Sequence, residues 1–263
     1  MNAALSIPPL RAVLLREFRA ALVNRYVQVF SALGLVGGIA TVSITETEGA
    51  AAFFLVQIAI YFVSLFALLV GVSAAQAEAE EWPILFAQPA PRWACGTGKF
   101  IALWTIFAGL LALLFAPAFF TEPPSAAIAQ LYLQTLGLAA VFGSLGLCMG
   151  FFAHDRVQGL ILGVSAWLLL LFGFDLVALL AAQWAPLQKH PDAWVASLML
   201  NPLDAFRIQA LFALEQIPAE AANKTPLANW WLTHTGLWLA ALSTAWTAAL
   251  LLATNRHLGR IEI

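Results

Sequence analysis

The sequence predicts an all-α, polytopic membrane protein with six transmembrane helices. Of its 263 residues, 62% are hydrophobic and 10% are charged, whereas soluble domains carry roughly 25% charged residues. Six apolar runs reach the length of about 20 residues that a helix needs to cross the hydrocarbon layer: about 26–44, 51–75, 99–120, 128–153, 159–182 and 231–254. These runs are continuously apolar and do not alternate, which favours helices over a β-barrel. We therefore expect one transmembrane domain over residues 1–263.

The positive charges indicate how the spans are oriented. When the loops are assigned alternately, one side holds Arg11, Arg16, Arg19, Arg25, Arg92, Lys99, Arg156, Arg256 and Arg260, and the other holds Lys189, Arg207 and Lys224. The positive-inside rule then places both termini in the cytoplasm. The first apolar run follows four arginines and has no small-residue cleavage site, so no cleaved signal peptide is expected. Cys95 and Cys148 fall on the cytoplasmic side and are expected to be free thiols.

Residues 8–24 precede the first span and are too charged to cross the membrane. Their apolar side chains recur near helical spacing, and Pro8-Pro9 is a natural helix start. We expect an interfacial helix that lies on the membrane and leads into the first span. The alternative is a disordered basic tail that only sets topology.

The loop at 76–98 interrupts the apolar sequence with an acidic run, Glu78, Glu80 and Glu81. A short apolar patch beginning at Trp82 follows, and then Pro89, Arg92 and Lys99. Acidic side chains cost too much to leave in lipid, so the loop must lie outside the hydrocarbon layer. We expect an amphipathic segment that lies at the membrane surface or docks on a cytoplasmic protein.

Glycines four residues apart recur in the first, fourth and fifth spans: Gly34 and Gly38, Gly146 and Gly150, Gly159 and Gly163. This spacing lets two helices approach closely. It predicts either packing within the chain or a face for self-association.

Asp175 is the one acidic residue inside a predicted span. A charge at the centre of a spanning helix costs roughly 2.5–3.5 kcal/mol on insertion scales. Asp175 is therefore expected to face the protein interior and to be protonated or paired. The outer loop at 183–230 offers a partner, because Arg207 follows a predicted helix start at Asn201-Pro202 with Asp204 in its first turn. Arg207 is expected to pair with Asp204 or with Asp175.

Several chemistries are missing from the sequence. A copper or zinc path would need several facing Cys, Met or His side chains, and the chain has 2 Cys, 3 Met and 4 His. No GxxxxGK[ST], GxSxG or HExxH motif occurs. We therefore expect no enzyme activity, no cofactor and no metal site in this chain.

The order of these features resembles the permease subunits of ABC-2 type transporters, which have an interfacial helix, six spans and a coupling loop between the second and third spans. Three local matches resemble the NosY-like branch, which serves copper maturation of nitrous oxide reductase. They are the loop through Glu78, Glu81, Pro89, Arg92, Gly98 and Lys99, the fifth span with Asp175, and the run Asn201-Pro202-x-Asp204-x-Phe206-Arg207. One departure is Trp82-Pro83, where many members have Gly-Thr.

The resemblance implies a homodimer in the bacterial inner membrane. It implies two copies of a cytoplasmic ATPase, which would hold ATP and magnesium, and a periplasmic β-helix protein that handles copper. Glu78, Glu80, Glu81, Trp82, Pro89, Arg92 and Lys99 would couple to the ATPase. Asn201, Pro202, Asp204, Phe206 and Arg207 would contact the periplasmic partner or hold the structure, and Asp175 would be the intramembrane acid. No nucleic-acid partner is implied.

The small supply of soft ligands favours transmission of a conformational change to the periplasmic partner over passage of copper through the bilayer. Three alternatives remain open. The chain could be an ABC-2 permease that exports a lipid, a polyketide, a peptide or another small molecule. It could be a secondary transporter driven by protons through Asp175, which would predict broken helices near the midplane. It could also be a structural scaffold.

Overall fold

The computed structural model describes residues 7–44, 50–77, 92–121, 126–181, 191–213 and 226–260. Nearly all of these residues are helical, and none of them is in a strand. Six helical runs are long and apolar enough to cross a membrane: Arg25–Ser43, Ala50–Gln76, Trp93–Phe119, Ala126–Phe152, Arg156–Val177 and Thr235–Arg260. The predicted all-α class with six membrane-crossing helices is therefore confirmed. The loops at 78–91, 182–190 and 214–225 lie outside the described residues.

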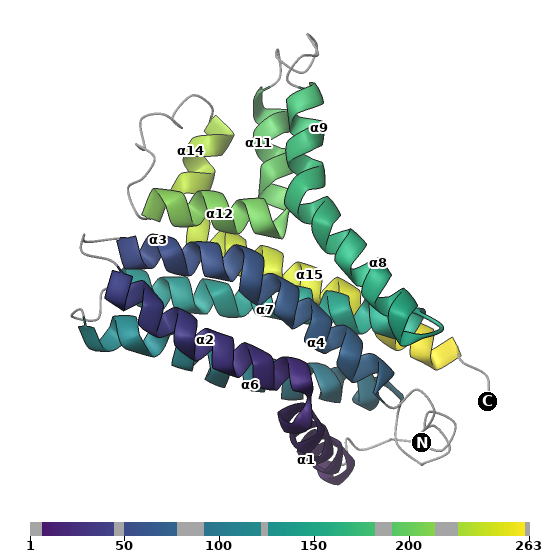
Figure 1. The fold of residues 1–263 in the computed structure, drawn as a ribbon. Coiled ribbons are helices and arrows are strands. Elements are labelled where there is room, and N and C mark those ends of the chain that lie inside the picture. The colour runs from purple at the N-terminus through teal and green to yellow at the C-terminus, as the bar shows by residue number, and fades with distance from the viewer. Residues whose placement is uncertain are drawn as a thin grey trace.

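The described elements follow one another as a bundle with smaller helices on one flank (Figure 1). They are α1 (Ile7–Val23), α2 (Arg25–Ile44), α3 (Ala50–Gln57), η1 (Ile58–Val63), α4 (Ser64–Gln76), α6 (Arg92–Thr121), α7 (Ala126–Phe152), α8 (Arg156–Leu168), η3 (Leu169–Gly173), α9 (Phe174–Ala181), α11 (Pro191–Leu200), α12 (Pro202–Ala213), α14 (Pro226–Thr233) and α15 (Thr235–Arg260). The sixth span begins at Thr235, later than the expected residue 231, because α14 ends at Thr233 and a break at His234 separates the two helices.

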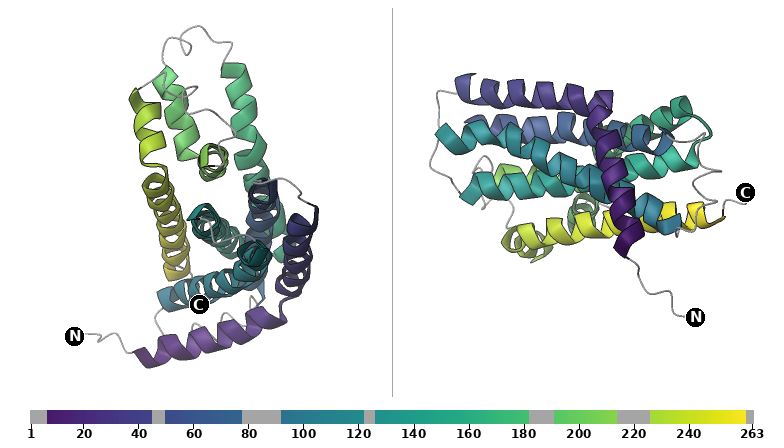
Figure 2. Two further views of the ribbon diagram at one scale, coloured as in Figure 1. Left: turned by 90° about the vertical axis from the view of Figure 1, so that its left-hand side faces the viewer. Right: turned by 90° about the horizontal axis from the view of Figure 1, so that it is seen from below.

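Helix α1 crosses the foot of the bundle and does not continue the direction of α2 (Figure 2). The chain changes direction at Asn24, whose side-chain Oδ1 accepts a hydrogen bond from the Tyr26 backbone N–H at 2.9 Å. An asparagine in this position satisfies one of the free N–H groups at the start of a helix. The predicted interfacial helix at 8–24 is thus present as a helix, and the disordered-tail alternative does not describe these residues. We call this part of the bundle the α1 end.

The second and fifth spans each contain a widened π-helical turn, η1 and η3. Trp167, just before η3, donates its indole N–H to the Ser64 hydroxyl, just after η1, at 2.8 Å. The Ser64 hydroxyl in turn donates to the Ile60 carbonyl inside η1. The hydrogen bond between the Trp167 and Ser64 side chains therefore connects the second and fifth spans beside these two turns.

The core of the bundle is the contact between α4 and α7, which depends on glycine. A Cβ atom built on Gly146 would overlap the Leu68 backbone carbonyl, and one on Gly150 would lie 2.6 Å from the Ala75 Cβ. Gly159 and Gly163 pack closely against α4 in the same way. These four glycines therefore allow close packing of helices within the chain. This was the first of the two roles predicted for the glycine pairs, the other being self-association. Gly34 differs, because its nearest atom would be 4.0 Å away.

Helix α12 lies along the flank of the bundle and contacts α7 and α15 (Figure 1). It begins at Pro202 directly after Asn201, as the sequence predicts. Leu203, Phe206 and Ala210 recur at helical spacing along one face of α12 and are buried, so α12 packs over the spans. Helix α9 and helices α11 and α14 project from the same side of the molecule (Figures 1 and 2).

We predict that Gly146→Ala lowers the stability of the protein by about 1–3 kcal/mol, the usual cost of overpacking a tight core. The added methyl group would meet the backbone of Leu68, which cannot move aside without shifting α4. Thermal unfolding of the detergent-purified protein measures the effect, and Gly34→Ala is the matched control in an open position. Equal melting temperatures for the two variants would contradict the importance of this contact.

Candidate functional site

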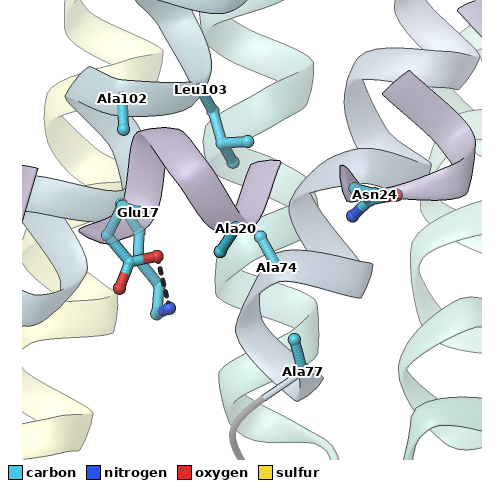
Figure 3. A pocket seen from close by; sticks show the side chains of 8 residues that line it. Glu17, Ala20, Asn24, Ala74, Ala77, Ala102 and Leu103 are labelled. Atoms are coloured by element: carbon cyan, nitrogen blue, oxygen red, sulfur yellow. Dashed lines mark hydrogen bonds and ion pairs between the residues drawn. The ribbon is translucent and has the colours of Figure 1, made fainter. Parts of the chain in front are cut away.

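A buried ion pair joins α1 to α6 at the α1 end of the bundle. The Lys99 Nζ lies 2.6 Å from the Glu17 Oε2, and the two side chains are only 2% and 7% exposed. Figure 3 shows the Glu17 carboxylate turned toward this ammonium group, beside Ala20, Ala102 and Leu103. A charge in such apolar surroundings is costly unless it is paired. The pair therefore fixes how α1 lies against the third span.

A second contact holds the turn between α1 and α2 against α4. The Asn24 side-chain amide donates to the Ser73 hydroxyl at 3.2 Å. Between the two contacts is a hollow of about 30 Å³ lined by small side chains, including Ala20, Ala74 and Ala77 (Figure 3). Helix α1 and the turn after it thus bridge α4 and α6, the two helices on either side of the loop at 78–91.

The structure places only part of the expected coupling set. Glu78, Glu80, Glu81, Trp82 and Pro89 lie outside the described residues, and the backbone of Arg92 begins α6. Lys99 is buried, and its ammonium group pairs with Glu17 on α1. Glu17 was not among the expected site residues. Its position in the sequence could have drawn attention to it, because Glu17 is the one acidic residue in a basic segment.

We predict that Lys99→Met lowers stability by about 3–5 kcal/mol, because it removes the ammonium group that lies 2.6 Å from the buried Glu17 carboxylate. The double variant Glu17→Met/Lys99→Met should be more stable than Lys99→Met alone, since two apolar side chains of similar size can replace a buried pair. Thermal unfolding of the wild type, both single variants and the double variant measures the coupling. Additive effects would contradict a direct interaction between the two side chains.

A second polar cluster, the α12 cluster, consists of Asn201, Asp204, Arg207 and Asp175. Asn201 is its centre. Its side-chain Oδ1 accepts from the Leu203 backbone N–H at 3.1 Å and caps α12, and its Nδ2 donates to the Asp204 carboxylate at 2.6 Å. The same Nδ2 donates to the Leu170 carbonyl in η3 at 2.8 Å. One amide therefore holds the start of α12 against the fifth span.

Arg207 completes the cluster by contacting two carboxylates. Its Nη2 lies 2.6 Å from the Asp204 Oδ1 and 3.1 Å from the Asp175 Oδ1. Both partners proposed for Arg207 from the sequence are thus present at once. The Asp204 side chain is only 2% exposed, whereas Arg207 and Asp175 are 32% and 47% exposed. Asp204 is therefore the one strongly buried charged side chain of the cluster, beside the equally buried Asn201 amide.

The charge state of the cluster follows from this burial. Helix α12 is not one of the six spans. Burial raises the pKa of the Asp204 carboxyl above its usual value, and the Asp175 charge acts in the same direction, whereas Arg207 and the Asn201 amide oppose them. Burial lowers the pKa of Arg207, but the hydrogen bond with Asp175 and the charge of Asp204 outweigh it, so the pKa is raised overall. Arg207 is therefore the fixed positive charge of the cluster.

The expectation that Asp175 faces the protein interior is wrong, although the expected pairing is present. Its side chain is nearly half exposed. The physical reason is that the fifth span leaves the bundle at an angle, so that Asp175 on α9 reaches Arg207 across the outside of the contact (Figure 1). The described helix continues beyond Asp175 with apolar residues as far as Ala181.

The sequence did not single out two tryptophans that hold the turn before α12. Trp238 and Trp246 on α15 donate their indole N–H groups to the carbonyls of Met199 at 3.0 Å and Leu200 at 3.1 Å. These are the last two carbonyls of α11, which lack partners within their own helix. A buried indole N–H usually has a hydrogen-bond acceptor. Two tryptophans in an apolar span could therefore have been predicted to bond to nearby carbonyl groups.

The motif residues act mainly inside the protein. Asn201, Pro202, Asp204 and Phe206 are buried, and Arg207 is partly exposed. Of the two roles considered for this motif, the geometry favours the structural one. The motif ties α12 to the fifth span, and the two tryptophans tie the preceding turn to the sixth.

We predict that Arg207→Met lowers stability by about 1–3 kcal/mol at neutral pH, because it leaves the Asp204 carboxylate buried without a cation. Asp175→Asn should cost less than about 1 kcal/mol, since that pair is largely exposed. Without Arg207 the pKa of Asp204 rises further, so the folded state binds a proton more readily than the unfolded state and the deficit shrinks as the pH falls. Thermal unfolding between pH 8 and pH 5 (roughly) tests both statements. A larger effect of Asp175→Asn than of Arg207→Met would contradict this account.

Within the segments that the structure describes, no three His, Cys, Asp or Glu side chains lie close enough together to hold a metal ion. Cys95 and Cys148 are both free thiols. No family model matches the chain, and no curated protein matches it. The function is therefore argued from the two clusters and from the arrangement of the helices.

Proposed function

We propose that the chain is the membrane-spanning permease subunit of an ABC-2 type transporter, with a separate cytoplasmic ATPase that binds ATP and magnesium. The observation that carries the proposal is the buried Glu17–Lys99 pair, which fixes an interfacial helix across the first turns of the third span. A helix that lies across the ends of the spans can transmit a displacement at the membrane surface to the bundle. The chain would work as a homodimer in a bacterial inner membrane, with both termini in the cytoplasm.

The position of the acidic loop supports this proposal. Residues 78–91 connect α4 to α6. Glu17 on α1 pairs with Lys99 on α6, and Asn24, directly after α1, donates to Ser73 on α4. A partner that grips Glu78, Glu80, Glu81, Trp82, Pro89 or the nearby Arg92 would act on the same two helices. The exposed arginines of the described chain that lie near this end, including Arg16, Arg19, Arg25 and Arg256, fit a cytoplasmic side.

The narrower proposal is that the permease serves copper maturation of nitrous oxide reductase together with a periplasmic β-helix protein. The α12 cluster supports this narrower proposal. The fifth span and the Asn201–Arg207 run, which both resemble the NosY-like branch, come together in one hydrogen-bonded group. In this proposal, movement of the spans shifts η3 and α9, and the cluster carries that shift to α12 and the loops beside it. No copper needs to pass through the bilayer. The alternative is an ABC-2 permease that exports a lipid, a peptide or another small molecule.

Co-purification tests the proposed assembly. We expect the chain, co-expressed with the ATPase encoded beside it and a periplasmic β-helix protein, to be recovered with both. Glu81→Arg should lose the ATPase, because it reverses the charge of the loop. Arg207→Glu should lose the periplasmic protein but keep the ATPase, because it places a third acid in the α12 cluster.

Matched charge reversals control for nonspecific effects. Arg260→Glu lies at the exposed end of α15, and Asp192→Lys lies on the exposed surface of α11; both should keep the whole complex. Recovery of the permease alone, with neither partner, would contradict the ABC assembly. ATP-dependent movement of radioactive copper into vesicles that contain the complex would instead overturn the transmission mechanism and leave the assembly intact.

A further inference from the structure

A groove of about 310 Å³ lies where α1, α2 and α6 meet, on the outside of the bundle. Phe18 and Leu22 of α1 line it on one side. Val27, Gln28 and Ser31 of α2 and Thr105, Ile106, Gly109 and Leu110 of α6 form its walls. At 1.5 Å per helical residue, the wall from Thr105 to Leu110 runs for roughly 8 Å along the third span. The groove thus extends from the interfacial helix toward the middle of the membrane.

The faces of α1 show which way the groove opens. Glu17, Ala20 and Asn24 share the face that meets the bundle. Leu15, Phe18 and Leu22 recur at helical spacing on another face and are exposed. Arg16 and Arg19 occupy the remaining face and are also exposed. An interfacial helix with one face on protein, one apolar and one basic lies with its apolar face in the acyl layer, so the groove opens toward lipid.

The walls suit a hydrocarbon chain and not a polar solute. The Thr105 hydroxyl donates to the carbonyl of Ile101 in its own helix at 2.8 Å, so its methyl group is left for the groove. The Gln28 amide donates to the Leu22 carbonyl at 3.5 Å. The neighbouring side chains Val29, Ile101 and Trp104 are exposed and apolar, which places the groove at the lipid-facing surface.

One basic side chain, Arg25, begins α2 directly after the turn that follows α1. Arg25 precedes Gln28 by three residues on α2, so the two side chains lie on the same helix face one turn apart. Arg25 is exposed and lies where α1 joins α2, at the boundary of the membrane. A guanidinium at this depth attracts the phosphate of an anionic lipid.

Gly109 creates the space inside the groove. A Cβ atom built on it would meet nothing within 4 Å, unlike the glycines at the contact of α4 and α7. No close helix contact requires a glycine at this position. Its effect in the described structure is to leave an exposed position of the groove wall on the third span without a side chain.

We propose that this groove binds one acyl chain of a phospholipid, with an anionic headgroup held by Arg25 at the level of α1. The bound chain fills the angle between the interfacial helix and the spans and supports α1 on the side opposite the Glu17–Lys99 pair. The inference does not depend on the substrate of the permease. It adds a lipid site to the surface that positions α1.

Lipid retention tests the proposal. The full chain is reconstituted in nanodiscs of equal parts phosphatidylglycerol and phosphatidylcholine, extracted in mild detergent, and its retained lipids are counted by native mass spectrometry. The wild type should prefer phosphatidylglycerol about fivefold, the effect of one basic side chain near a membrane surface. Arg25→Gln should retain lipid without that preference. Gly109→Leu fills the groove and should retain several-fold less of both lipids.

Gly259→Leu is the matched control, because a Cβ atom there also meets nothing within 4 Å, and it should behave as the wild type does. Ser31→Leu narrows the groove from α2 and serves if Gly109→Leu does not fold. Unchanged lipid retention in a folded, groove-filling variant would overturn the proposal. A change in oligomeric state with unchanged lipid retention would also overturn it and would assign the groove to a second copy of the chain.

Discussion

Every polar group placed in an apolar medium must find a partner, and this constraint shapes the whole structure. Water is not available inside a bilayer to satisfy a carbonyl, an indole N–H or a charge. In this chain the partners come from distant segments. Lys99 meets Glu17 across 82 residues, and Trp167 meets Ser64 across 103. Apolar packing brings the spans together, and these few polar contacts decide how they are oriented.

Two kinds of contact divide the work. The spans α4 and α7 approach through glycine and small side chains, which provide a close, non-directional surface. The shorter helices α1 and α12 are attached differently, each through a charged group and an asparagine. A glycine contact resists separation everywhere along its length. Helix α1 also packs along α6, and α12 buries Leu203, Phe206 and Ala210 against the spans, so the polar contacts set the direction of helices that are already packed.

The sequence was sufficient for the features that depend on length and composition. Six apolar runs, the helix at 8–24 and the start of α12 at Asn201-Pro202 follow from local rules, and the structure contains them. The partner of Arg207 could be narrowed to two acids but not chosen, because both are within reach. The exposure of Asp175 could not be predicted, since it depends on the angle at which the fifth span leaves the bundle. The Glu17–Lys99 pair depends in the same way on how α1 crosses α6. The positions of Trp238 and Trp246 in the sequence predict that their indole N–H groups have acceptors, but they do not identify the Met199 and Leu200 carbonyls as those acceptors.

The widened turn at Leu169–Gly173 has a consequence for the register of the fifth span. A π-turn holds one residue more than the α-helical path, and each residue of a helix turns the next side chain by about 100°. Every side chain beyond the turn is therefore rotated relative to those before it. Asp175 comes two residues after the turn, and its direction toward Arg207 is set by that extra residue. The fifth span thus presents two different faces along its length, one to the bundle at Trp167 and another to α12.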